Sequence, residues 1–313
     1  MKRIIIALAA LAMTAGIASA QDMAMATDTF NQAATILNDE NGDKTEALKL
    51  FKEALSMGEQ CGEEGEELVT NCKKVIPGII LSIAKGQINN AEYDTAVATL
   101  KEAAQVAGEY EVEGIAEEVE ELIPDAFLRK GATLLKAKDF AGAAEALKNV
   151  ISYKPEDGQT FLMLGQALMQ TGDTDAAIAA LNSASEFGKA AQAGKLLGNI
   201  YLKQGMTFLK AGDNAGAIEA LEKVNAIAEN ANAYKLLASA YTKSGKTANA
   251  LESYKNYLRL NPDAKDAAGV KLTIAATAQK SGDKATAIEY YKMLIGDAQY
   301  GATAKQQLDV LQK

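Results

Sequence analysis

Internal repetition is the feature that most limits how this chain can fold. Residues 131–150 read GATLLKAKDFAGAAEALKNV and residues 205–224 read GMTFLKAGDNAGAIEALEKV, and thirteen of these twenty positions are identical. Internal repetition of this kind is typical of proteins built from one small supersecondary unit. A single unit cannot bury its apolar face alone, so the repetition predicts a stack of units that share a continuous core.

The best-defined unit covers residues 231–264 and predicts two helices. The first helix has residues of one face at the spacing i, i+3, i+4, i+7: Tyr234, Leu237, Ala238 and Tyr241. After a turn at Gly245, the second helix has the residues Ala250, Tyr254 and Tyr257 on one face. Pro262 ends this helix, because proline cannot continue it.

A helix pair with small residues at the crossing and a closing proline resembles the tetratricopeptide repeat. The small residues at the crossings include Gly131, Gly165, Gly205, Ala238 and Ala275. Comparable patterns predict units at 28–61, 77–110, 124–157, 158–191, 198–230, 231–264 and 268–301, and a last helix over 302–313. The resemblance implies an all-α fold, an α-solenoid of about seven helix–turn–helix units that form a right-handed superhelix.

The N-terminal units fit the pattern less well than the others. In the first unit, Thr35 and Asn38 occupy the expected small and large places, as in a terminal repeat with one exposed face. Extra segments precede the second and third units, at 67–77 and 114–124. Both carry apolar residues at helical spacing and end in proline, so we expect helices that run into the next unit, bent or restarted at the proline.

The N-terminus has the pattern of a secretory signal peptide. Lys2 and Arg3 precede an apolar run over 4–17, and Ala18-Ser19-Ala20 matches a signal-peptidase site. We expect residues 1–20 to be removed and 21–313 to form an exported, periplasmic or secreted solenoid without a membrane span; an uncleaved anchor is the alternative. No cysteine follows the apolar run, as a lipoprotein anchor would require.

Composition excludes several classes of function. The chain has no histidine, so it has no His-ligated metal and no Ser-His-Asp or Cys-His pair. Its formal net charge of −9 argues against binding of nucleic acid. Ser244-Gly245-Lys246-Thr247 resembles the end of a phosphate-binding loop, but Ala240 stands where that loop needs glycine. We therefore expect no cofactor, no metal and no catalysis.

The two cysteines, Cys61 and Cys72, are close in the sequence. In an exported chain such a pair favours a disulfide, which would join the end of the first unit to the segment 67–77. Two buried free thiols are the alternative reading. The spacing is not that of a CxxC redox site.

The resemblance implies that the first helices line a concave face on which partners bind. Four lysines lie near the ends of these helices: Lys136, Lys210, Lys243 and Lys280. Together with Lys235, which lies earlier on the same helix as Lys243, they predict a basic stripe that binds a protein or peptide through an acidic segment. Lysine in a last turn also complements the helix dipole, so this simpler interpretation stays open.

Residues 109–125 carry many carboxylates, which indicates either a docking site for a basic partner or a solvated helix face. The sequence thus favours a non-catalytic scaffold or adaptor of the bacterial envelope. A self-associating structural protein and an envelope enzyme that uses carboxylates are the alternatives. The sequence leaves the oligomeric state and the identity of the partner open.

Overall fold

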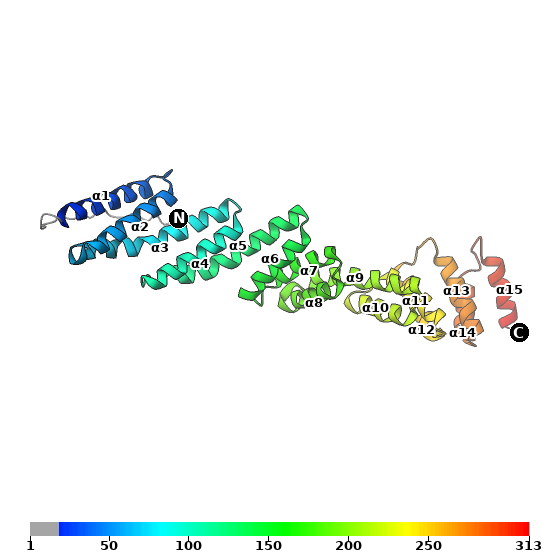
Figure 1. The fold of residues 1–313 in the computed structure, drawn as a ribbon. Coiled ribbons are helices and arrows are strands. Elements are labelled where there is room, and N and C mark those ends of the chain that lie inside the picture. Colours follow the sequence, from blue (N-terminus) through cyan, green and yellow to red (C-terminus); the bar gives the residue numbers. More distant parts are fainter. Residues whose placement is uncertain (1–18, 313) are drawn as a thin grey trace. The chain divides into compact units, whose positions relative to one another are not determined.

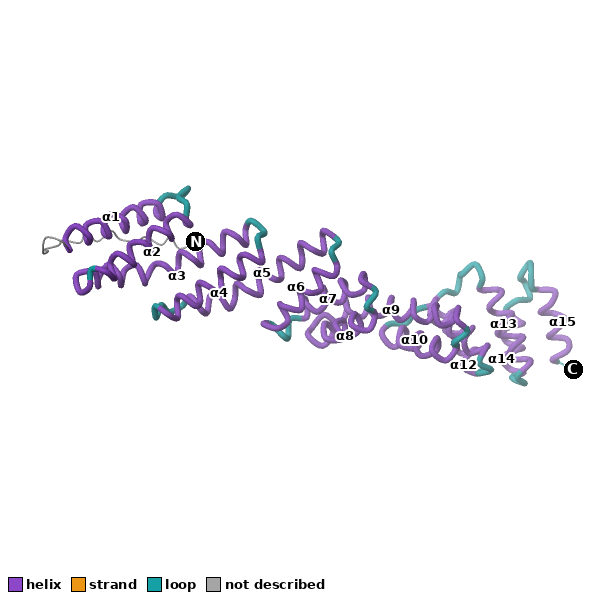
Figure 2. Tube along the Cα trace, in the orientation of Figure 1, coloured by secondary structure: helices purple, strands orange, loops and turns teal. Residues whose placement is uncertain are grey.

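The computed structural model describes residues 19–312, and nearly all of its regular structure is α-helix (Figure 1). No strand occurs between these residues, as the purple and teal trace of Figure 2 shows. Residues 1–18 of the expected signal peptide lie outside the described range. Helices follow one another in antiparallel pairs that contact their neighbours in the chain, so the fold is an all-α solenoid.

The chain divides into two compact units, one up to Glu156 and one from Asp157. The helices of unit 1 are α1 (Ser19–Asn38), α2 (Lys44–Gln60), α3 (Glu66–Asn89), α4 (Tyr93–Glu109), α5 (Ile115–Ala137) and α6 (Phe140–Tyr153). The helices of unit 2 are α7 (Gly158–Thr171), α8 (Thr174–Ala184), α9 (Ala190–Ala211), α10 (Asn214–Ile227), α11 (Ala231–Lys243), α12 (Thr247–Leu260), α13 (Ala267–Lys280), α14 (Lys284–Lys292) and α15 (Gly301–Leu311). Odd-numbered helices up to α13 are the first helices of their pairs, and even-numbered helices are the second.

In most of the pairs, the turn is closed by an aspartate at the start of the second helix; α4 and α12 have Glu92 and Lys246 as N-cap residues and make no such bond. The side chains of Asp139, Asp173, Asp213 and Asp283 each accept a backbone N–H from the first turn of α6, α8, α10 and α14. These bonds satisfy N–H groups that have no partner inside the helix, and the negative charge suits the positive end of the helix dipole.

Glycine at the crossing lets the two helices of a pair approach closely. A Cβ atom on Gly165 would lie 2.6 Å from Cγ of Leu181, and one on Gly205 would lie 2.5 Å from Cγ of Leu221. Both leucines are fully buried on the second helices α8 and α10. The small residues expected at the crossings therefore lie where the sequence places them.

The segments 67–77 and 114–124 are helical and continue into the following first helices. They form the N-terminal parts of α3 and α5, and Pro77 and Pro124 are buried inside these helices. Neither helix restarts at its proline. The helix α9 is also extended, because it begins at Ala190, ahead of the expected unit at 198–230.

The first helix, α1, begins at Ser19 and packs on α2 in a different register from the one expected. Ala33 and Ala34 are fully buried, whereas Thr35 and Asn38 are exposed. Phe30 contacts Phe51 of α2 edge to face, with ring centroids 5.2 Å apart. The stretch is rich in small residues, so several registers fit its pattern, and packing against α2 selects this one.

At the other end, α15 covers the last helix pair. Leu308 is buried, and Leu311 packs against the same apolar cluster of α12 to α14. The last helix thus lies where the sequence predicts it.

Candidate protein-binding surface

Contacts between pairs show which helices lie on the inner side of each unit. In unit 2, α9 contacts both α7 and α11, and in unit 1, α3 contacts α5. No two second helices within residues 19–312 contact each other to a comparable extent. The first helices α3 and α5, and α7, α9 and α11, are therefore closer together than the second helices, so their exposed faces form the inner surface. We assign α13 to the same surface because it is the first helix of the last pair.

Three lysines occupy equivalent places on this surface of unit 2. Lys210, Lys243 and Lys280 lie in the last turns of α9, α11 and α13, five residues after the small crossing residues Gly205, Ala238 and Ala275. All three are exposed, and none forms an ion pair with another described residue. Lys136 has the same place on α5, in unit 1, and is also exposed.

Lys235 differs from the other expected binding lysines because it is engaged inside the chain. Its Nζ lies 2.5 Å from Oδ2 of Asp266 and 5.4 Å from the ring centroid of Tyr257. The Tyr257 hydroxyl donates to Oδ1 of Asp266 at 2.6 Å. The lysine and then the tyrosine lower the pKa of Asp266 by hydrogen bonding to its carboxylate. This cluster joins α11 and α12 to the start of α13, so the charge of Lys235 is paired within the chain, and its role in binding stays a prediction.

Two further lysines lie where the second helices α12 and α14 begin. Lys246 is the N-cap residue of α12, and Lys284 is the first residue of α14. We call Lys210, Lys243, Lys246, Lys280 and Lys284 the lysine edge. The segments 210–214, 243–247 and 280–284 contain these five lysines and two aspartates, so their net charge is +3 in a chain of −9.

Lys246 stands where other pairs of the unit have aspartate. It makes no side-chain capping bond, and its charge opposes the helix dipole. Its Nζ lies 5.9 Å from the ring centroid of Tyr241, a cation–π contact of about 0.5–1 kcal/mol at an exposed site. The missing cap costs about 0.5–2 kcal/mol. The repeat pattern alone does not single out Lys246 as a binding residue, although Gly-Lys stands at 245–246 where other pairs have Gly-Asp.

One turn before the lysines, small or unbranched residues face the same inner surface. These are Met206 on α9, Ser239 on α11 and Ala276 on α13, each four residues before a lysine. Met206 is 44% exposed, which is unusual for a large apolar side chain. The surface therefore combines accessible apolar area with unpaired positive charge.

A hollow of unit 2 lies between the N-terminal half of α9 and the junction of α10 and α11. Its volume is about 600 Å³. It is lined by small residues of α9 and by Val224 and Ile227 of α10. Lys195 and Glu229 at its rim have opposite charges, so the hollow has no marked preference for a ligand of one sign.

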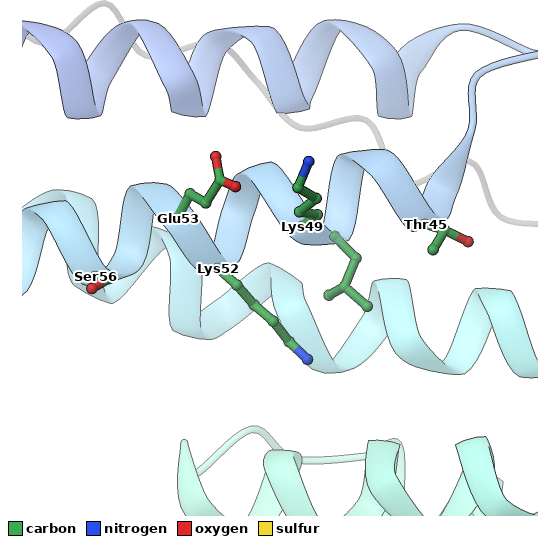
Figure 3. Close-up of a pocket in the computed structure, with 6 residues that line it drawn as sticks. Thr45, Lys49, Lys52, Glu53 and Ser56 are labelled. Atoms are coloured by element: carbon green, nitrogen blue, oxygen red, sulfur yellow. The ribbon is translucent and has the colours of Figure 1, made fainter.

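A hollow of unit 1 is lined by one face of the second helix α2 and has a volume of about 450 Å³. Figure 3 shows Lys49, Lys52 and Glu53 projecting from this face. Lys52 is paired with Glu102 of α4 at 3.3 Å, and Lys49 with Glu46 at 3.7 Å. Its lysines are therefore neutralised within the chain, unlike those of the lysine edge.

The acidic segment expected at 109–125 is partly neutralised by neighbours in unit 1. Glu118 pairs with Lys85 at 2.6 Å, Glu121 with Lys154 at 3.2 Å, and Asp125 with Arg129 at 2.8 Å. These pairs favour the interpretation of a solvated helix face.

Cys61 and Cys72 are free thiols in the structure, and they pack at the same apolar cluster of unit 1. Burial raises the pKa of Cys72 to about 12, and desolvation, Asp22 and Glu64 raise the pKa of Cys61. Protonated thiols are poor nucleophiles, so neither residue has the environment of a redox-active cysteine. The disulfide itself stays a prediction.

Within residues 19–312, no group of three or more Cys, Asp or Glu residues could hold a metal ion. None of the helices in that range is long and apolar enough to cross a membrane.

Comparison with models of protein families identifies the helix pairs. Residues 134–200, and then 202–264 and 235–302, match models of the tetratricopeptide repeat. The chain is a tetratricopeptide-repeat protein. The matched tetratricopeptide repeats include every residue of the lysine edge. A comparison with curated protein sequences finds no match.

Solved structures similar to this tetratricopeptide-repeat protein include the MamA protein. One MamA structure is 23% identical, covering 57% of this chain and 94% of its own, with a TM-score of 0.34. MamA from Desulfovibrio magneticus is 19% identical, covering 61% and 97%, with a TM-score of 0.32. The C-terminal part of a tetratricopeptide-repeat protein from Cytophaga hutchinsonii is 19% identical, covering 70% and 81%, with a TM-score of 0.34.

Proposed function

We propose that this protein is a non-catalytic scaffold or adaptor of the bacterial cell envelope that binds a protein or peptide on the inner surface of unit 2. The repeats, and the contacts between successive first helices, support a role in protein interaction. The pattern of residues 1–20 supports export. The observation that carries the proposal is the exposed lysine edge, whose last-turn lysines Lys210, Lys243 and Lys280 have no ion-pair partner within residues 19–312.

Site-specific photo-crosslinking tests the binding surface. A photoreactive residue at Met206, on the inner surface of α9, is compared with one at Glu252, which is exposed on the second helix α12. Crosslinking in cells of the source bacterium should give a discrete protein adduct from position 206 and none from position 252. Equal adducts from both positions, or none from 206, contradict the proposal.

Export is tested on the intact mass of the protein recovered from the envelope fraction. Cleavage after Ala20 predicts a chain that starts at Gln21. Recovery of full-length chain from the cytoplasm contradicts this part of the proposal and leaves the binding surface untouched.

Self-association is a second candidate, because large apolar side chains are exposed near the C-terminal end of unit 2. Met293 is 51% exposed, Ile295 42% and Val310 60%. Such residues are typical of an end that contacts another molecule. Light scattering over a range of concentrations distinguishes the two, since a scaffold of this type stays monomeric and a self-associating protein gains mass.

A further inference from the structure

The hollow beside α9 lies at the opposite end of this helix from the lysine edge. Its α9 residues lie between Ala190 and Leu202. Lys195 at the rim lies about 22 Å along the helix from Lys210 of the lysine edge. The hollow is therefore a place separate from the proposed binding surface.

An apolar side chain of α10 is exposed at the hollow. Ile227, the last residue of α10, is 40% exposed. A Cβ atom on Gly194 would lie 3.1 Å from Cγ2 of Ile227, whereas one on Gly198 would meet no atom within 4 Å. The space over Gly198 is therefore open, and the volume of the hollow, about 600 Å³, is in the range of sites that bind ligands.

In unit 1, the pair of α3 and α4 has a longer second helix than the pair of α9 and α10. The helix α4 continues from the fully buried Leu100 to Glu109. The helix α10 continues from the fully buried Leu221, which has the same place in the repeat, only to Ile227. The difference is about one turn of helix. By position in the repeat, the extra turn of α4 corresponds to the place of the hollow.

The extra turn of α4 covers the N-terminal half of α3 with an aromatic side chain. Ala107 in this turn is buried, and Tyr110 at its end packs against the apolar cluster that includes Cys72 of α3. Nζ of Lys73, also on α3, lies 5.6 Å from the ring centroid of Tyr110. A helical turn that ends in an aromatic residue thus fits this place on a long first helix.

The corresponding side of α5 is exposed to water and strongly charged. The second helix of this pair, α6, also ends early, at Tyr153. The residues of α5 at this place include Glu117, Glu120 and Glu121, which are all exposed. Glu121 pairs with Lys154, which follows α6, at 3.2 Å. Charged side chains are readily hydrated, so this side of α5 needs no cover.

The corresponding side of α9 lacks these charges. Seventy-four residues further along the chain, Ala191, Gly194 and Lys195 stand in place of the three glutamates, and Ala228 stands in place of Lys154. None of the α9 residues that line the hollow carries a carboxylate. This side of α9 therefore resembles the covered side of α3 more than the hydrated side of α5, although its own second helix ends too early to cover it.

We propose that the hollow binds a helical segment of a partner protein that carries an aromatic side chain. The segment lies on α9 beyond the end of α10, as the last turn of α4 lies on α3. Its ring enters the open space over Gly198 beside Ile227, and Lys195 contacts the face of the ring. An uncharged ring agrees with the opposite charges at the rim. This contact is additional to the one on the inner surface.

A fluorescent helical peptide with the sequence of residues 97–110 tests the inference with the full chain, because it contains the turn that covers α3. A hydrocarbon staple on its polar side keeps it helical, since short isolated helices are unstable in water. Its control differs only by Tyr110→Ala. We expect the peptide that keeps Tyr110 to bind at least about fivefold more tightly by fluorescence anisotropy. Equal affinities, or no binding of either peptide, overturn the inference.

Gly198→Leu shows whether the peptide binds in the hollow. The new side chain fills the open space, and leucine favours the helix, so the thermal midpoint should not fall. Affinity for the peptide should fall about tenfold. Gly86→Leu is the matched control, because a Cβ on Gly86 of α3 also meets no atom within 4 Å. It should leave affinity within about twofold. Unchanged affinity in Gly198→Leu overturns the inference.

Ile227→Asp is a second variant, which does not depend on filling the hollow. Ile227 and Tyr153 have the same place in their repeats and are 40% and 43% exposed, so Tyr153→Asp is its control. Affinity should fall about tenfold in Ile227→Asp alone, and equal affinities of the two variants contradict the inference. Failure here is distinguishable from failure of the proposed function. An adduct from position 206 together with no affinity for the peptide would retain the inner surface and reject the hollow.

Discussion

Single glycines decide how closely the helices of a pair can pack, and α9 contains two that have opposite surroundings. Gly205 faces the buried Leu221, whereas a Cβ on Gly198 would meet no atom within 4 Å. The same substitution should therefore have opposite effects at two places of one helix.

We predict that Gly205→Ala lowers the free energy of unfolding by about 1–3 kcal/mol, because the added methyl group overlaps Leu221 in a packed interior. Gly198→Ala should raise it by about 0.5–1 kcal/mol, because alanine favours the helix. Urea unfolding followed by circular dichroism measures both. Equal effects of the two substitutions would contradict the close crossing at Gly205.

We predict a disulfide between the two cysteines in the exported protein. Oxidation in the envelope should join Cys61 and Cys72, whose side chains pack at one apolar cluster. Mass spectrometry of alkylated protein, with and without prior reduction, should then show two modified cysteines only after reduction. Two free thiols in the exported protein would contradict the disulfide and agree with the free thiols of the structure.

Among the helices, α13 is attached to its neighbours by the carboxylate of its N-cap residue, which makes no capping bond to the helix. Asp266 is the N-cap residue, yet its side chain binds Lys235 and Tyr257 instead of a backbone N–H. The lowered pKa of this carboxyl means that its ionised form stabilises the fold. The contribution is present above the ordinary pKa of 3.8 and is lost as the pH falls through the lower, folded value.

We predict that Asp266→Asn destabilises unit 2 at neutral pH by at most about 1 kcal/mol, because the pair is largely exposed. The difference from wild type should shrink as the pH falls below 3.8. Thermal unfolding across this range measures it, with Asp263→Asn in the same loop as the control. A difference that persists at the lowest pH would contradict an ionic origin.

Sequence alone predicted the elements well where the repeat has distinctive residues. The similar segments 131–150 and 205–224 placed α6 and α10, and their crossing glycines, correctly. The register of α1 was not predicted, because a helix with many small residues has no single apolar stripe. Lys246 was missed as well, since its importance depends on where α12 begins, which is a property of the folded turn.

At the scale of the whole molecule, each unit has its own contacts, and helices contact mainly their neighbours in the chain. The free energy of unfolding of such a stack is a sum of contributions from each repeat and its contacts with its neighbours. A destabilising substitution should therefore affect mainly the helices around it. Leu147 and Leu221 offer a matched pair, because both are fully buried at equivalent positions of the two repeated segments.

We predict that Leu147→Ala and Leu221→Ala each remove about 2–5 kcal/mol of stability, and each only from its own unit. Hydrogen exchange measured by mass spectrometry should show faster exchange up to Glu156 in the first variant and from Asp157 in the second. Faster exchange along the whole chain in both variants would show that the two units unfold together.

We propose that the lysine edge of unit 2 binds the physiological partner. The most direct measurement is the affinity of the partner identified by crosslinking from position 206 for full-length Lys243→Glu and Lys292→Glu. Both change the charge of a last turn by the same amount, but Lys243 lies on the inner surface and Lys292 on a second helix. We expect affinity to fall about tenfold or more for Lys243→Glu and to change little for Lys292→Glu. Equal affinities of the two variants would contradict it.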